Sequence, residues 1–204
     1  MSKRPGIDLF CEDRAHEELL TPLLERCCAE EGLSHATVKT RSAIGGHGRA
    51  LEELQKYQVI LRHQGASVPD LLVVAIDANC TPYSEMTGQI KRKINPELFP
   101  HTALACPDPH IERWYLADSA AFEAAVGARP LDVQPGCGKE DRYELKRALA
   151  ESVRRAGHPP LLGGIEFARD LAAEIDPFRA GKADAAFKHF FDAVRAALRQ
   201  LSRR

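Results

Sequence analysis

The stretch Leu71-Leu72-Val73-Val74-Ala75-Ile76 is an unbroken apolar run, rich in β-branched residues, which follows Pro69-Asp70 and ends at Asp77. A run without a polar face predicts a strand that is buried on both sides, as at the centre of a parallel sheet. Open α/β sheets bind their ligands beyond the carboxyl ends of the strands. Asp77 and Asn79 follow this strand, so they fall where such a fold has its ligand site. We expect their side chains to point the same way, because alternate strand residues share a face.

A second strand pattern near the N-terminus also ends in acidic residues. Residues 7–11 form a short apolar strand candidate followed by Glu12 and Asp13, and an amphipathic helix with a kink at Pro22 is expected over 17–31. If the two strands are neighbours, Glu12 meets Asp77 and Asn79. Their oxygen atoms suit Mg²⁺, while the plainer interpretation of each acidic residue is a helix cap or a loop residue.

Strand and helix patterns alternate through the first half of the chain. Further strands are expected at about 35–41 and 101–106, and helices at about 50–64 and 82–95. This alternation predicts an α/β fold, a Rossmann-like, mainly parallel sheet flanked by helices. From about residue 119 the pattern becomes helical, which predicts an α/β domain over 1–118 and a helical C-terminal region over 119–204. We expect that region to cap the ligand edge, with the aromatic stripe of its last helix in the core.

The composition describes an ordinary globular chain. Its 204 residues are 44% hydrophobic and 28% charged, with a formal net charge of −1. Nucleic-acid binding would therefore need a local basic patch. No apolar run has the length of a membrane span, and the first residues do not resemble a signal peptide. The six cysteines include no CxxC motif, so we expect reduced thiols in a cytoplasmic protein.

Several basic residues are candidates for holding a nucleic-acid backbone. Lys91, Arg92 and Lys93 cluster in the last turn of the helix expected over 82–95, and Arg49 and Arg113 are the other candidates. Cations in a last turn also suit the helix dipole. Both interpretations of the cluster stay open at this level.

The glycine loop with Gly45, Gly46 and Gly48 precedes an expected helix. Glycines let a backbone approach a ligand closely, and a helix N-terminus favours anions, so phosphate binding is one interpretation. The loop matches neither a Walker motif nor GxGxxG, and a plain turn is the other. His16, His47 and His110 lack the spacing of a zinc site.

Three stretches resemble motifs of a known family. Residues 10–17 (FCEDRAHE) are similar to the Glu-Gly motif of TOPRIM domains, with Asp13 in place of glycine, and residues 75–80 (AIDANC) are similar to the Asp-x-Asp motif, with Asn79 in place of the second aspartate. Together with residues 111–118 (IERWYLAD), they resemble an uncharacterised bacterial TOPRIM-like family related to the nuclease domain of OLD-type proteins. The similarity runs over most of the chain.

The resemblance implies a Mg²⁺- or Mn²⁺-dependent nuclease or phosphoryl-transfer effector that acts on nucleic acid, DNA more than RNA. Family members are often encoded beside ABC- or AAA-type ATPases in antiphage loci, which implies an ATPase partner and leaves room for a homo-oligomer. The implied catalytic residues are Glu12 and Asp77, and the implied metal ligands are Glu12, Asp77, Asn79 and Glu112.

Asn79 supplies an oxygen but no charge, so the alternative is a non-catalytic TOPRIM-like module that binds nucleic acid or protein. A third class of function is a phosphate-handling enzyme that uses the glycine loop. Because Asp77 follows a strand and is expected beside solvent, we also expect Asp77→Ala to leave the fold intact.

Overall fold

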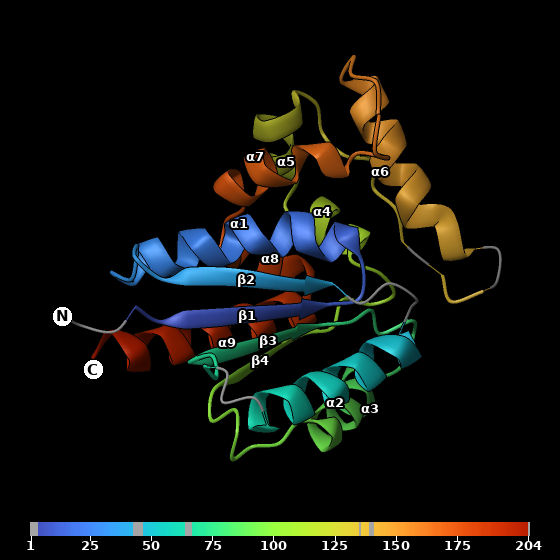
Figure 1. Cartoon of the computed structure of the whole chain (residues 1–204). Helices are drawn as coiled ribbons and strands as arrows, with labels where there is room; N and C mark the ends of the chain where they lie inside the picture. The colour runs from blue at the N-terminus through green and yellow to red at the C-terminus, as the bar shows by residue number, and fades with distance from the viewer. Residues whose placement is uncertain (1–3, 43–46, 64–66, 135, 139–140, 204) are drawn as a thin grey trace.

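The chain forms a four-stranded parallel sheet flanked by helices (Figure 1). The computed structural model describes residues 4–42, 47–63, 67–134, 136–138 and 141–203, the side chains of 42, 47, 48 and 142 excepted. The strands are β1 (Gly6–Cys11), β2 (Thr37–Ser42), β3 (Leu71–Ala75) and β4 (Thr102–Ala105), in the spatial order β2-β1-β3-β4. The predicted α/β, Rossmann-like fold is confirmed.

The apolar run that was expected to be central is central. All five residues of β3 are buried, and the strand pairs with β1 on one side and β4 on the other. The register places Cys11 opposite Ala75, the last residues of their strands. The segments that begin with Glu12 and Ile76 therefore leave the sheet side by side at its carboxyl edge.

Helices cover both faces of the sheet. Helices α1 (Arg14–Glu30) and α9 (Ala185–Ser202) pack on one face, and α2 (His47–His63) and α3 (Tyr83–Lys93) pack on the other (Figure 1). Alternate strand residues point to opposite faces. Leu9 therefore contributes to the core under α1 and α9, and Phe10 to the core under α2 and α3. Helix α1 continues through Pro22, where a kink or restart was expected.

The remaining elements follow β4. They are α4 (Glu112–Leu116), α5 (Ser119–Val126), the 3₁₀ turn η1 (Asp141–Tyr143), α6 (Glu144–Arg155), the 3₁₀ turn η2 (Ile165–Phe167), α7 (Ala168–Glu174) and α8 (Pro177–Ala183).

The helical C-terminal region shares its core with the sheet. Trp114 packs edge-on against Phe187, with ring centroids 5.1 Å apart, and stacks on Phe190 at 5.5 Å. One cluster of buried residues joins these rings to β1, β3 and α1. The aromatic stripe of α9 is therefore core, and α9 lies on a face of the sheet. Figure 1 shows α6 on the side to which the strand arrows point. Helix α6 is therefore the one that comes nearest to the position expected for a cap over the carboxyl edge of the sheet.

Candidate functional site: a carboxylate–histidine cluster

Glu12 and Asp77 meet where β1 and β3 end. The backbone N–H of Glu12 donates to the Ala75 carbonyl at 3.0 Å, which extends the ladder by one residue. The backbone N–H of Asp77 donates to Glu12 Oε2 at 3.1 Å. The sequence prediction that these two residues come together is thus supported by a direct hydrogen bond. With Asp13, His16 and His110 they form what we call the carboxylate–histidine cluster.

Asp77 is a buried hub of this cluster. Its Oδ1 accepts from the backbone N–H of Ile111 at 2.8 Å and lies 3.1 Å from His16 Nε2, while Oδ2 lies 3.1 Å from His110 Nδ1. Burial disfavours its charge, but the charge of His16 and the hydrogen bond from His110 outweigh burial and hold the pKa of Asp77 below its usual value. The expectation that Asp77 stands beside solvent is wrong, because the turn after β4 covers it.

His16 lies fully buried in the first turn of α1. Asp13 caps this helix, since its Oδ1 accepts from the His16 backbone N–H at 3.1 Å and lies 2.8 Å from His16 Nδ1. Burial opposes the imidazolium, but Asp77 and Asp13 on either side raise the pKa of His16 to about 10. Burial likewise opposes the charge of Asp13, and His16 lowers the pKa of that carboxyl to about 2. The ring is therefore charged at neutral pH.

Sequence reasoning missed this role of His16, which it weighed only as a zinc ligand. Two signals were available: a histidine three residues after an aspartate that precedes a helix, and an aspartate after the neighbouring strand. The spacing suits an N-cap that also contacts the ring. Only the strand order tells which carboxylate lies on the ring's other side.

Glu12 is the partly open member of the cluster. Burial and the neighbouring charge of Asp77 raise the pKa of Glu12, against the hydrogen bond from the Asp77 backbone. That bond occupies Oε2. Within the part of the chain that the structure describes, Oε1 has no hydrogen-bond partner. This carboxylate can therefore accept a proton or a cation without breaking an existing contact.

Asn79 does not point where strand alternation predicted. Strand β3 has ended, and Asn79 and Cys80 adopt left-handed conformations with φ of 49° and 63°. The Asn79 side-chain amide donates to the Asp77 carbonyl at 3.1 Å. Asp108, in the turn after β4, accepts from the backbone N–H of Cys80 at 2.9 Å. The predicted direction of the Asn79 side chain assumed an extended backbone, whereas the chain forms a tight turn here.

Glu112 follows the turn after β4 and is only 4% exposed. Its Oε1 lies 3.6 Å from Lys146 Nζ of α6, and its buried Oε2 has no hydrogen-bond partner among the described residues. Burial raises the pKa of Glu112, against the charge of Lys146. The charges of Asp77 and Asp13 also act on it, so Glu112 lies beside the cluster without a hydrogen bond into it.

The described residues contain no group of three or more His, Cys, Asp or Glu side chains that could hold a metal ion. His16 contacts Asp77 through Nε2, and His110 contacts it through Nδ1. Any divalent cation at this edge would rest on one or two carboxylates, with water or substrate completing its coordination.

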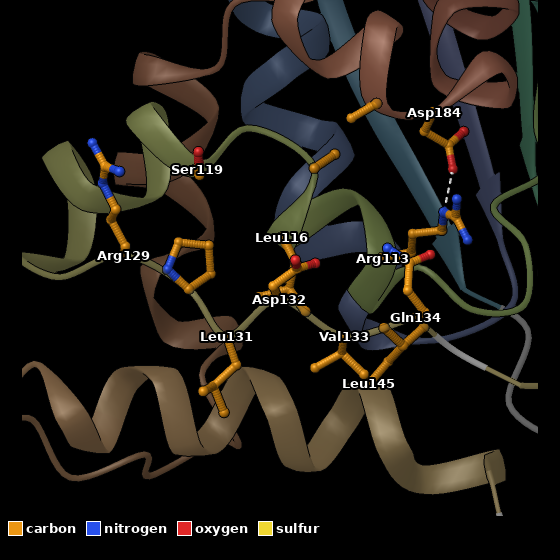
Figure 2. Close-up of a pocket in the computed structure, with 13 residues that line it drawn as sticks. Arg113, Leu116, Ser119, Arg129, Leu131, Asp132, Val133, Gln134, Leu145 and Asp184 are labelled. Atoms are coloured by element: carbon orange, nitrogen blue, oxygen red, sulfur yellow. Dashed lines mark ion pairs between the residues drawn. The ribbon is translucent and has the colours of Figure 1, made fainter.

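The basic candidates come from three helices, α2, α3 and α4. Arg113 Nε lies 2.7 Å from Asp184 Oδ2 in an ion pair, and Arg113 lines a separate pocket of about 410 Å³ (Figure 2). Lys91, Arg92 and Lys93 are exposed in the last turn of α3, about 15 Å along the helix from the end nearest the site, and their position suits the helix dipole. Arg49 is exposed in α2.

The structure describes only part of the glycine loop. Gly45 and Gly46 lie outside the described residues, and Gly48 belongs to the first turn of α2. The two interpretations of the loop, a phosphate site and a plain turn, therefore stay predictions.

The cysteines correct one expectation. Cys80 and Cys137 form a disulfide, which links the turn after β3 to the segment before α6. The expectation of reduced thiols is wrong for this pair, because the fold brings together two residues that are 57 positions apart. Cys11, Cys27, Cys28 and Cys106 are buried and are not part of a disulfide among the described residues. Burial raises the pKa of Cys28 to about 11, so that thiol is unreactive at neutral pH.

No family model, curated protein or solved structure matches this chain. The TOPRIM-like resemblance therefore stays a prediction that rests on the motifs quoted above. Among the described residues, no helix is both long enough and apolar enough to cross a membrane.

Proposed function

We propose that the carboxylate–histidine cluster hydrolyses phosphodiester bonds of nucleic acid with the help of a divalent cation, Mg²⁺ or Mn²⁺. The observation that carries the proposal is the hydrogen bond from the Asp77 backbone to Glu12 Oε2, because it joins the ends of two neighbouring strands. Two carboxylates at the carboxyl edge of a parallel sheet lie where α/β folds bind their ligands.

The carboxylate oxygens of this site suit a cation whose remaining ligands come from water and substrate. Glu12 offers Oε1, and Asp77 offers Oδ2, which lies 3.1 Å from His110 Nδ1. Proteins commonly bind Mg²⁺ through one or two carboxylates, with waters and substrate phosphate as the other ligands. The cation would supply positive charge against the phosphate oxygens. Of the two further ligands implied by the resemblance, Asn79 donates from its amide nitrogen to the Asp77 carbonyl, and Glu112 pairs with Lys146 through Oε1.

His110 is the proton donor in this proposal. Its Nδ1 lies 3.1 Å from Asp77 Oδ2. This contact orients the ring and leaves Nε2 for a substrate oxygen. The hydrogen bond to Asp77 raises the pKa of His110, so the ring keeps its proton to higher pH than an ordinary imidazole. Glu12, with its raised pKa, takes the complementary role of the group that accepts a proton from water.

A cleavage assay on plasmid DNA and on RNA, with Mg²⁺, Mn²⁺ or a chelator, tests the proposal. Glu12→Gln and His110→Gln should each lower the cleavage rate at least about 100-fold, as expected for a lost general acid or base. Glu52→Gln, at an exposed position of α2, is the matched control. Cleavage that survives the chelator, or that survives Glu12→Gln, contradicts the metal-assisted mechanism at this site.

One observation favours the alternative, a non-catalytic TOPRIM-like binding module. Both carboxylate oxygens of Asp77 already contact groups of the same chain, namely Ile111, His16 and His110. Nucleic-acid binding by wild-type protein, with unchanged substrate at every cation tested, would support this second function over the first.

The remaining parts of the proposal rest on the resemblance alone. They are a preference for DNA over RNA, an ABC- or AAA-type ATPase partner, self-association and a role in phage defence. The cytoplasmic location, expected from the cysteine pattern, is a proposal as well. Co-purification of the chain with an ATPase encoded beside it tests the partner. Cleavage measured with and without that ATPase tests whether the partner controls activity.

A further inference from the structure

A small pocket of about 170 Å³ lies beside His110 of the carboxylate–histidine cluster. Its walls include His110, both cysteines of the Cys80–Cys137 disulfide, and the glycines Gly136 and Gly138. The His110 side chain is 12% exposed, and this pocket is a route from solvent to its ring. Small-molecule pockets begin at about 300 Å³. The space beside His110 is therefore too small for a nucleotide in this form of the chain.

The disulfide ties one wall of this pocket to the edge of the sheet. It joins Cys80, in the turn after β3, to Cys137, in the segment before α6. The backbone N–H of Gly138 donates to Asp141 Oδ2 at 2.9 Å, and the backbone N–H of Asp141 donates to the Gly138 carbonyl at 3.1 Å. These hydrogen bonds stay within the segment before α6. The link from Cys137 to the turn after β3 is the covalent bond.

The disulfide is also accessible to reagents in solution. Cys137 is an exposed residue and Cys80 is half-buried, whereas the described cysteines outside the bond are buried. Thiol–disulfide exchange requires a thiolate to reach one of the two sulfur atoms. Exposed disulfides are accordingly the labile ones, which proteins use for regulation, so this bond can be reduced while the chain stays folded.

We propose that the Cys80–Cys137 disulfide is a redox switch that closes the candidate site beside His110, and that a protein dithiol opens the site by reducing it. The inference rests on the proposed function, since it names how that same site is regulated. After reduction, the segment that carries Cys137 is no longer bound to the turn after β3. It can then move away from His110 and admit a substrate.

The reduction is an ordinary thiol–disulfide exchange. A thiolate of the reductant attacks Sγ of the exposed Cys137 and displaces Cys80 as a thiolate. The second thiol of the reductant then displaces Cys137 from the mixed disulfide. The two protons of the dithiol end on Cys80 and Cys137, and the reductant leaves as a disulfide.

Labelling with diethyl pyrocarbonate tests the switch without any cleavage, because this reagent acylates accessible imidazoles. The full chain is labelled at one fixed pH in its disulfide form and after reduction with dithiothreitol, with the reductant removed, and peptides are measured by mass spectrometry. Reduction should raise labelling of His110 at least about threefold relative to the exposed His35, because labelling follows the population of the open form. His16 is fully buried and should stay unlabelled in both forms.

Variants of the segment before α6 separate the bond from other effects of the reductant. Cys137→Ser should label like the reduced wild type and should not respond to dithiothreitol. Because Cys137 is exposed, this change removes no core contact. Gln134→Ala, at an exposed position of the same segment, keeps the disulfide and is the matched control, so its labelling should respond as in the wild type.

Three results overturn the inference: equal His110 labelling in the two forms, a rise that His16 shares because reduction unfolds the chain, or an oxidised protein without the Cys80–Cys137 link. Cleavage at the same rate in both forms also overturns it and leaves the proposed function standing. A redox-dependent label on His110 without cleavage in either form supports the switch and removes the nuclease.

Discussion

His16 Nε2 lies 3.1 Å from Asp77 Oδ1, and this buried ion pair joins the first turn of α1 to the end of β3. The two atoms are close but not aligned as a hydrogen bond, so the attraction is chiefly between charges. Asp13 holds the other nitrogen of the ring at 2.8 Å. The charged, fully buried imidazole of His16 thus lies between two carboxylates and holds together the edge of the sheet where Glu12 and His110 lie.

His16→Gln should destabilise the protein by about 3–5 kcal/mol, because removing one partner leaves a buried carboxylate uncompensated. Urea unfolding followed by circular dichroism measures the change. His35→Gln, at an exposed position before β2, is the matched control and should change stability by less than about 0.5 kcal/mol. A loss below about 1 kcal/mol in His16→Gln would show that the ring is not charged in the folded state.

Stability should fall as the pH rises from 6.5 toward 10. Folding raises the pKa of His16 from 6.5 to about 10, so the folded state binds the proton more tightly. That contribution is complete below pH 6.5 and disappears as the pH passes through about 10. Chemical denaturation at a series of pH values measures the slope. His16→Gln should flatten the curve over this window, and a wild-type curve that is already flat contradicts the assignment.

Asp77→Ala should lower stability by about 3–5 kcal/mol, contrary to the expectation from its position at a strand end. The change removes one of the two carboxylates that flank the buried His16 charge, and it removes the acceptor of the Ile111 backbone N–H. Thermal or urea unfolding checks the result. Loss of activity in Asp77→Ala would therefore mix chemistry with folding, and a variant as stable as wild type would refute the role of Asp77 as a structural hub.

Asn79→Asp should strengthen Mg²⁺ binding, since it adds a carboxylate beside Asp77 at an exposed position. The cost in stability should be about 1 kcal/mol, because one hydrogen bond to the Asp77 carbonyl is lost. Calorimetric titration with Mg²⁺ in the presence of a non-cleavable oligonucleotide measures the affinity. An affinity that does not rise places the cation away from this turn.

Reduction of the Cys80–Cys137 disulfide should lower stability by up to about 4 kcal/mol, since the bond closes a loop of 57 residues. Unfolding with and without a dithiol reductant measures the difference. The double variant Cys80→Ser with Cys137→Ser should match the reduced protein and no longer respond to reductant. A reductant effect that remains in the double variant would point to another cause.

The sequence by itself determined the sheet and its central strand. The run over 71–76 has no polar face, and only a strand covered on both sides keeps such a run from water. The alternation of strands with amphipathic helices likewise determined the parallel order, because parallel strands need crossover connections. These signals are local, so they can be read one segment at a time.

The contacts of the site were decided by tertiary structure. Pairing of β1 with β3 in register makes Glu12 a neighbour of Asp77, and the turn after β4 brings His110 onto the same carboxylate. Lys146 reaches Glu112 only because α6 packs against α4. Hydrogen bonds and ion pairs act over a few ångströms between residues far apart in the chain. Strand order, helix placement and turn conformation therefore choose the partners, and no local pattern records that choice.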